Sequence, residues 1–302
     1  MCLDIPNKIE LVNTINHINN VDLEKVSYER IYSAILNEIR YVPVEKRNIS
    51  TGTLICRGRV NKGNFFCSEK EITYNCDVFN IKKFGRMNTP YQTLFYGSIA
   101  TEAIINPEVI ALFEISNFLP DINSTGAEII TVGIWRVKDD IKIIDTSFRL
   151  EDIEKLKEKY SKKTEEIDLI VNLFSKNLKR KKSDVPNHNY YKISAAYSNF
   201  IFEKFPDYAG ITYPSIKTDM KGYNIVMLPE VADNNLELIY VKVFQIIKVK
   251  ADSIYDEFMF AKNLGIYNTD FKWEFTNQYS KLVESTYTSI KGEGLADLNK
   301  SE

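Results

Sequence analysis

Short strand patterns with longer helical segments set between them restrict this chain to a mixed architecture. Apolar residues recur every three positions near the N-terminus, which predicts helix over residues 8–40. Helix is also predicted over the charged residues 150–182 and over residues 190–205. Because short antiparallel strands with helices inserted between them are typical of α+β proteins, the sequence predicts that fold class.

Strand patterns alternate with these helices along most of the chain. We expect strands over residues 53–59, 93–96, 108–116, 128–137, 141–146, 210–213, 223–228 and 236–250. The polar, irregular stretch 61–83 predicts a loop, and the residues after 252 predict a mixed segment that includes helix. The expected organisation is an N-terminal helical extension over 1–50, a core over 51–250 and a C-terminal segment over 251–302 packed on that core.

The charge balance argues against general nucleic-acid binding. Lys plus Arg number 39 and Asp plus Glu number 41, so the net charge is -2. The basic run at residues 179–182 falls at the end of a predicted helix, where positive charge complements the helix dipole. A nucleic-acid contact through that run is the alternative interpretation.

The cysteines, the histidines and the apolar runs indicate the compartment. The four cysteines form no CxxC pair, so we expect free thiols in a reducing environment. With only His17 and His188, a His-rich metal site is excluded, and we expect no metal. No apolar run approaches the roughly 20 residues of a membrane span, and the first residues lack an apolar signal core. We therefore expect a cytoplasmic protein that does not contact a membrane.

Four side chains are candidates for chemistry, and each also has an ordinary structural interpretation. Arg86, beside a glycine in a loop, suits a phosphate or a carboxylate, or is a surface residue in a turn. Tyr96 ends an apolar strand and would normally belong to the core. Glu114 lies inside an apolar run, where a carboxylate is rare unless paired, or it faces water from a strand edge. Ser215 follows a proline and could simply begin a turn.

The order of several motifs resembles that of the RES domain family, which is named for its Arg, Glu and Ser motifs. The matching segments are Gly85-Arg86-Met87-Asn88, Tyr96, Ala111-Leu112-Phe113-Glu114, Gly210-Ile211-Thr212-Tyr213-Pro214-Ser215 and Gly222-Tyr223-Asn224. Arg57 matches the arginine of the family's early strand, and the resemblance covers about residues 52–250. One departure is that Glu114 lies further from Tyr96 than in many members and falls in a predicted strand, with Glu102 and Glu108 between them.

The resemblance implies an ADP-ribosyltransferase-like core and NAD⁺ as substrate. It also implies a toxin that destroys NAD⁺ by glycohydrolysis or phosphorolysis and is neutralised by an antitoxin partner. Arg86 and Arg57 would then hold the pyrophosphate, and Tyr96 would pack on the nicotinamide or its ribose.

The remaining roles that the resemblance implies concern the ribose and the dinucleotide. Glu114 would accept hydrogen bonds from ribose hydroxyls, and Ser215 would position the ribose or the incoming nucleophile. Asn88 and Asn224 would help to bind NAD⁺.

Other functions stay open at this point. The same first step serves an ADP-ribosyltransferase that modifies a macromolecule. A binding module without turnover is favoured if Glu114 points away from Arg86 and Tyr96 and neither Glu102 nor Glu108 takes its place. The apolar stripes of residues 1–50 would cover the core, form a homo-oligomer contact or receive an antitoxin. Gly-rich phosphate loops are absent, which disfavours dehydrogenases and P-loop enzymes.

Overall fold

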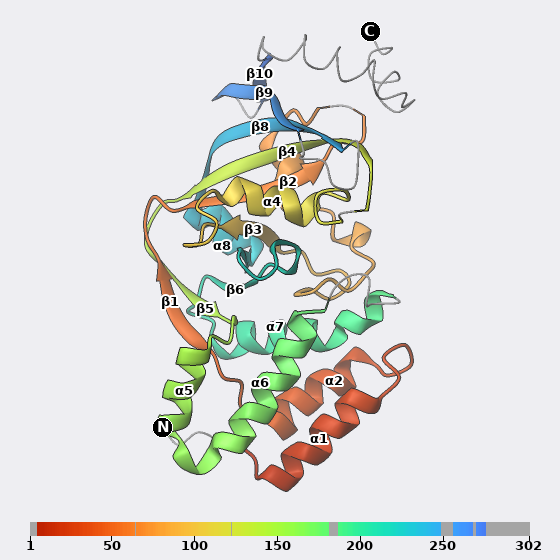
Figure 1. The fold of residues 1–302 in the computed structure, drawn as a ribbon, viewed down its shortest axis with the longest axis vertical. Coiled ribbons are helices and arrows are strands. Elements are labelled where there is room, and N and C mark those ends of the chain that lie inside the picture. The colour runs from red at the N-terminus through yellow and green to blue at the C-terminus, as the bar shows by residue number, and fades with distance from the viewer. Residues whose placement is uncertain are drawn as a thin grey trace.

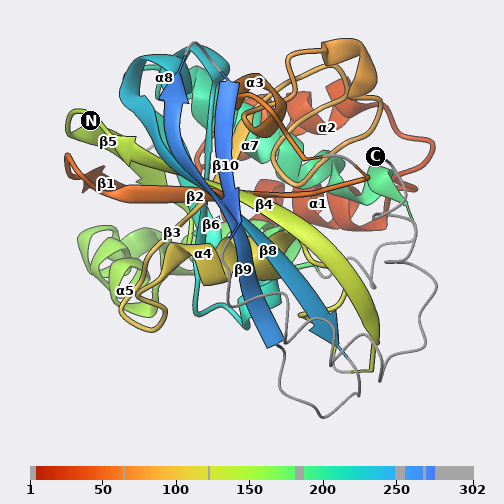
Figure 2. The same cartoon turned by 90° about the horizontal axis from the view of Figure 1, so that it is seen from above.

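One sheet runs through the protein (Figure 1). The computed structural model describes residues 5–63, 65–121, 123–180, 187–248, 256–267 and 270–275. In chain order the strands are β1 Glu45–Ile49, β2 Leu54–Val60, β3 Phe95–Ile99, β4 Gly126–Val137, β5 Ile141–Asp145, β6 Gly210–Pro214, β7 Tyr223–Met227, β8 Leu236–Lys248, β9 Asp256–Tyr267 and β10 Asp270–Phe275. In space the order is β1-β5-β6-β7-β3-β2-β4-β8-β9-β10. Figure 2 shows how far the strand direction turns between β1 and β10.

Neighbouring strands pair antiparallel, with the exception of the parallel pair β5 and β6. The helical elements are α1 Lys8–Asn20, α2 Tyr28–Ala34, the π-helical turn η1 Ile35–Ile39, α3 Glu69–Ile72, η2 Val78–Asn80, α4 Pro107–Ile115, α5 Leu150–Lys159, η3 Ser161–Lys163, α6 Thr164–Leu178, η5 His188–Tyr191, α7 Lys192–Lys204, η6 Ile216–Thr218 and α8 Pro229–Asn235. The predicted α+β class is therefore confirmed.

The N-terminal helices form a layer with α6 and α7 (Figure 1). The side chains of Asn7 and Ser27 cap α1 and α2, because each accepts a hydrogen bond from a backbone N–H in the first turn. Of the apolar stripe predicted for α1, Ile15 and Ile18 are buried against this layer, whereas Ile9 is exposed. The ammonium of Lys192 donates to the backbone oxygens of Leu23 and Val26 at 2.7 and 2.8 Å, which fastens the turn between α1 and α2 to α7.

Residues 107–115 form a helix, so the strand predicted over 108–116 was wrong. The Asn106 side chain accepts from the backbone N–H of Glu108 at 2.9 Å, and Pro107 occupies the first turn, where its missing N–H costs nothing. An apolar run of this length does not by itself distinguish a buried strand from a buried helix. The asparagine and proline ahead of it were the signal for a helix.

Other differences from the sequence analysis are smaller. The helix α8 begins at Pro229, directly after the strand expected over 223–228. The expected loop 61–83 contains the single turns α3 and η2. In the C-terminal segment, the described residues form β9 and β10. Residues 249–255 and 276–302, for which a mixed segment with helix was expected, lie outside the described residues, as do Lys181 and Lys182 of the basic run.

The helices among the described residues are all too short or too polar to cross a lipid bilayer.

The two central strands separate after a short contact. β2 pairs with β3 at only two positions, Ile55 with Ile99 and Cys56 with Ser98, although β2 pairs with β4 at seven positions and β3 with β7 at five. Beyond Cys56 the inner edges of β2 and β3 therefore diverge, and the sheet opens in its middle. The helix α4 covers this opening from one face (Figure 1).

Gly58 sets how closely α4 approaches the opening. A Cβ atom at this position would lie 2.9 Å from Cγ2 of Ile115 and 3.1 Å from the backbone oxygen of Ala111. Since real side chains rarely come this close, only glycine permits the observed packing of α4 on β2.

We expect Gly58→Ala to lower the free energy of unfolding by about 1–3 kcal/mol, because the added methyl group overpacks the contact between β2 and α4. Urea denaturation measures the change. Asn48→Ala, at an exposed position on the edge strand β1, is the control and should change stability by less than about 0.5 kcal/mol. Equal stability of the two variants would contradict this account of the packing.

Candidate active site

A cavity of about 300 Å³ occupies the opening between β2 and β3. It is lined by Cys56, Arg57, Gly58 and Arg59 of β2, Tyr96, Gly97 and Ser98 of β3, Ala111, Glu114 and Ile115 of α4, Tyr213 of β6 and Asn224 of β7. Residues separated by more than 160 positions thus meet in one place. Four of the seven residues singled out from the sequence are among them: Arg57, Tyr96, Glu114 and Asn224.

Glu114 is the acid of this cavity. Its Oε1 atom accepts hydrogen bonds from Oγ of Ser215 at 2.5 Å and from Nδ2 of Asn224 at 2.7 Å. Oδ1 of Asn224 in turn accepts from Oγ of Ser98 at 3.0 Å, which fixes the amide. None of the described residues donates to Oε2 of Glu114. The carboxylate is therefore held by one oxygen and offers the other as a hydrogen-bond acceptor.

The end of α4 that carries Glu114 is held in place by the turn after β6. Nζ of Lys217 donates to the backbone oxygens of Glu114 and Ser116 at 2.7 and 3.1 Å, which satisfies carbonyl groups that the helix end leaves free. In the same turn Oγ of Ser215 accepts from the backbone N–H of Thr218 at 3.3 Å. One short turn thus positions both the backbone and the carboxylate of Glu114.

The other two acids considered from the sequence do not reach the cavity. Glu108 forms an ion pair with Lys242, with Oε1 and Nζ 2.5 Å apart. Glu102 is exposed, and neither residue lines the cavity. Glu114 is therefore the acid that shares a cavity with Tyr96.

Arg57 and Arg59 lie on the same face of β2 and bring positive charge to the cavity. Nε of Arg57 donates to the backbone oxygens of Ile72 and Thr73, both at 3.2 Å, and Nη1 donates to the backbone oxygen of Tyr96 at 2.6 Å. Nη2 of Arg59 also donates to the backbone oxygen of Thr73, and its Nε is buried with no hydrogen-bond partner among the described residues.

Neither guanidinium has an acidic partner among the described residues, in contrast to Arg47, Arg136 and Arg149, which pair with acids. Burial lowers the pKa of Arg57 to about 9, and the neighbouring charge of Arg59 acts in the same direction. Burial also lowers the pKa of Arg59. Arg57 thus remains protonated at pH 7, and arginine in general keeps its charge. The cavity wall therefore carries two positive charges without a counter-ion from the described chain.

Two tyrosines complete the wall. The hydroxyl of Tyr96 donates to Oδ1 of Asn88 at 2.8 Å and accepts from the backbone N–H of Met87 at 3.3 Å. Burial raises the pKa of Tyr96 and of Tyr213 above the ordinary value, so both phenols are neutral at physiological pH. They supply aromatic surface and do not act as bases. Gly85 belongs to this arrangement, because a Cβ there would lie 2.2 Å from Oδ1 of Asn88.

Three of the residues predicted from the sequence do not line the cavity. Asn88 is buried and binds the hydroxyl of Tyr96, and Ser215 is buried and binds Glu114. Arg86 donates from Nη1 to the backbone oxygen of Leu178 at 2.9 Å and from Nη2 to that of Arg180 at 3.2 Å. Its guanidinium therefore fastens the end of α6, which is a different position from the expected place at a pyrophosphate.

Sequence reasoning missed Arg59, Ser98 and Tyr213 as wall residues. The signal for Arg59 was present, since Arg57 and Arg59 are two apart in a predicted strand and so share a face. Tyr213 lay inside one of the quoted motifs. Ser98 had no sequence signal, because its place depends on the pairing of β3 with β7.

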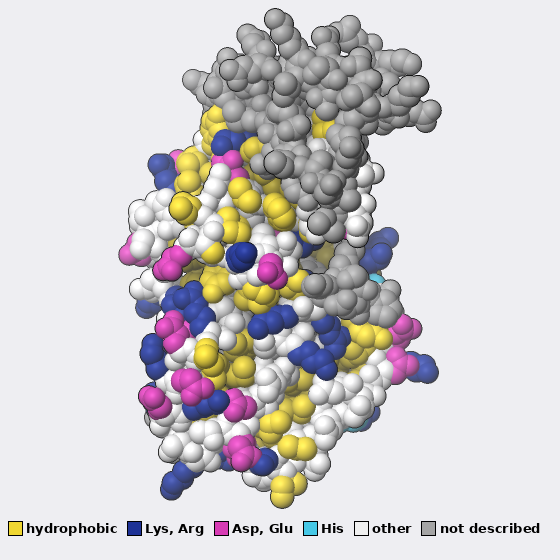
Figure 3. All heavy atoms as spheres, viewed as in Figure 1, with side chains coloured by type: hydrophobic (Ala, Val, Ile, Leu, Met, Phe, Trp, Pro, Cys, Tyr) yellow, Lys and Arg dark blue, Asp and Glu magenta, His cyan; other side chains and the backbone are white. Residues whose placement is uncertain are grey.

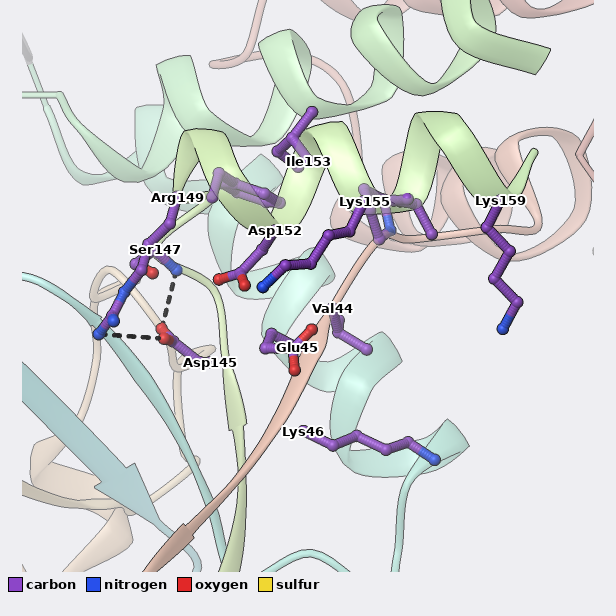
Figure 4. A pocket seen from close by; sticks show the side chains of 13 residues that line it. Val44, Glu45, Lys46, Asp145, Ser147, Arg149, Asp152, Ile153, Lys155 and Lys159 are labelled. Atoms are coloured by element: carbon purple, nitrogen blue, oxygen red, sulfur yellow. Dashed lines mark hydrogen bonds and ion pairs between the residues drawn. The ribbon is translucent and has the colours of Figure 1, made fainter. Parts of the chain in front are cut away.

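Two larger cavities have a different character. One of about 350 Å³ lies between β1 and the turn from β5 into α5 (Figure 4). Two of its acids are already paired: Arg47 bridges Asp145 and Asp152 at 2.8 and 2.7 Å, and Arg149 lies 3.8 Å from Asp145. The other, of about 890 Å³, contains Asp233 and Glu237, which bind Tyr74 and Arg136. The cavity with Glu114 differs because its two arginines have no acidic partner among the described residues.

Charges elsewhere on the molecule are mixed. On the face drawn in Figure 3, basic side chains are interspersed with acidic ones. Within the described ranges, no group of three His, Cys, Asp or Glu residues is arranged to hold a metal ion.

No protein-family model matches this chain, and the search of curated proteins also returns no match.

We expect Lys217→Met to lower the free energy of unfolding by about 1–2 kcal/mol, because the last carbonyl groups of α4 lose a charged donor. Thermal or urea unfolding measures the effect. Lys221→Met is the matched control, since Lys221 is exposed and its side chain makes no hydrogen bond or ion pair that the structure describes. A Lys217→Met protein as stable as the control would show that Lys217 does not anchor α4.

Proposed function

We propose that this protein consumes NAD⁺ by breaking the bond between nicotinamide and ribose in the cavity between β2 and β3. The observation that carries the proposal is that one cavity contains both a carboxylate with a free oxygen and two guanidinium groups without acidic partners among the described residues. A substrate that matches it has anionic phosphate at one end and sugar hydroxyls at the other.

The chemistry of NAD⁺ suits this set of side chains. Nicotinamide leaves as a neutral base from a positively charged ring nitrogen, so its departure needs no general acid. The ribose passes through a state that resembles an oxocarbenium ion, and a fixed negative charge beside it lowers the barrier. Neither step requires histidine or a metal ion.

In this proposal Glu114 accepts a ribose hydroxyl on Oε2 and stabilises the cationic sugar. Ser215 and Asn224 hold Oε1 and so keep the carboxylate from turning away. These two are positioning residues. Such preorganised charge acts without reorganisation during the reaction, which is why it is effective.

The rest of the wall binds substrate. Arg57 and Arg59 take the phosphate, because planar guanidinium groups donate paired hydrogen bonds to it. Tyr96 and Tyr213 pack on the nicotinamide ring or the ribose. Arg86 contributes indirectly through the turn that it joins to α6.

The motif order described above supports the same proposal, and with it membership of the RES domain family and its ADP-ribosyltransferase-like core. The wider proposal is then a cytoplasmic toxin that an antitoxin protein neutralises. The apolar stripes of residues 8–39 are largely buried within the chain. An antitoxin would therefore bind another surface, such as the mouth of the cavity.

Transfer of ADP-ribose to a macromolecule is the alternative, since it shares the first step. Incubation with labelled NAD⁺ separates the two. Free ADP-ribose, or its phosphorylated form when phosphate is present, supports the proposed reaction. Label retained on a protein or nucleic acid supports transfer.

We expect Glu114→Gln to reduce NAD⁺ consumption by about 100-fold or more, because the neutral amide no longer stabilises positive charge on the sugar. Release of nicotinamide measures the rate. Glu102→Gln is the matched control and should keep the wild-type rate, because Glu102 is exposed and outside the cavity. A Glu114→Gln protein that consumes NAD⁺ at the wild-type rate would remove Glu114 from the mechanism, and an inactive wild-type protein would contradict the proposed function.

A further inference from the structure

We infer that the cavity recognises only the nicotinamide half of the dinucleotide, so that nicotinamide mononucleotide is also a substrate. This inference rests on the proposed function and adds a substrate class to it. The size of the cavity, the position of its charges and the hydrogen bonds of Arg86 support it.

The cavity is small for a dinucleotide. Its volume of about 300 Å³ lies at the lower limit of ligand cavities. A nicotinamide ring with its ribose and one phosphate fills a space of this size. The adenosine half of NAD⁺ would then lie outside, where it adds little to binding.

The charges and the acid line the same cavity. A Cβ on Gly58, which stands between Arg57 and Arg59, would face α4 at Ala111 and Ile115, so the two arginine side chains leave β2 on the face away from α4. Glu114 and the two arginines therefore approach the opening between β2 and β3 from opposite faces of the sheet. A phosphate on C5′ of a ribose whose other hydroxyls face Glu114 would be directed through this opening toward the arginines.

Arg86, the other cation that could hold a second phosphate, forms its hydrogen bonds elsewhere. Both terminal nitrogens of Arg86 donate to backbone oxygens at the end of α6. By contrast, Nε of Arg59 is buried and has no partner among the described residues. A buried donor without a partner is uncommon, and an anion in the cavity would satisfy it.

The reaction of the mononucleotide balances without a further reactant besides water. The bond between C1′ and the ring nitrogen breaks, and its electron pair stays on nicotinamide, which leaves neutral. Water forms the new bond to C1′ and releases a proton. The products are nicotinamide and ribose 5-phosphate.

The test compares three substrates with the full-length protein: NAD⁺, nicotinamide mononucleotide and nicotinamide riboside, which lacks the phosphate. We expect kcat/KM for the mononucleotide to be within about tenfold of that for NAD⁺. The riboside should be poorer by about 100-fold, because the two guanidinium groups are then left unpaired.

An Arg59→Gln variant tests the assignment of the phosphate. The ratio of kcat/KM for the mononucleotide to that for the riboside should fall by about tenfold or more. This ratio does not depend on the fraction of folded protein. Arg136→Gln is the matched control, since Arg136 pairs with Glu237 away from this cavity, and the ratio should be unchanged.

The outcomes separate the inference from the proposed function. Cleavage of NAD⁺ without cleavage of the mononucleotide would overturn the inference and leave the proposed function in place. An unchanged ratio in Arg59→Gln would also overturn it. Failure to cleave any of the three substrates would contradict the proposed function itself.

Discussion

The separation of β2 from β3 after two paired positions is the constraint on which the candidate site depends. A fully paired sheet would close this space, and Arg57, Tyr96 and Asn224 would be divided between its two faces. Because each strand remains paired on its outer side, the opening does not leave the sheet unsupported. Arg57 crosses the opening and donates to the backbone oxygen of Tyr96, which otherwise has no strand partner there.

The site combines a carboxylate that is held in place with two arginines that have no acidic partner among the described residues. Glu114 is fixed by Ser215, Asn224 and, through its backbone, Lys217, so its position depends on elements distant in sequence. The two arginines of β2 are fixed by backbone oxygens and not by acids. Well-ordered charges that the described chain does not neutralise are costly to a folded protein, and such groups are typical of ligand sites.

Part of this arrangement was predictable from the sequence. The α+β class, the N-terminal helices and most strands followed from periodicity. The order of motifs also brought out Glu114, Tyr96, Arg57 and Asn224, which do share a cavity. The helix at 107–115 was missed because a short apolar run has no decisive period. The position of Arg86 was not predictable, since its partners are backbone oxygens near residue 180, more than 90 residues away. Burial of Ser215 likewise depends on tertiary packing.

The guanidinium of Arg86 connects the helical layer to the cavity in the sheet through hydrogen bonds. It joins the last turn of α6 to the tight turn Gly85–Asn88, where the backbone N–H of Gly85 donates to the oxygen of Asn88. Asn88 binds the hydroxyl of Tyr96, whose ring forms the cavity wall. A displacement of the α6 terminus is therefore transmitted to the site through one arginine, one amide and one phenol. A partner that binds the helical layer and moves this terminus would change the cavity wall by the same route.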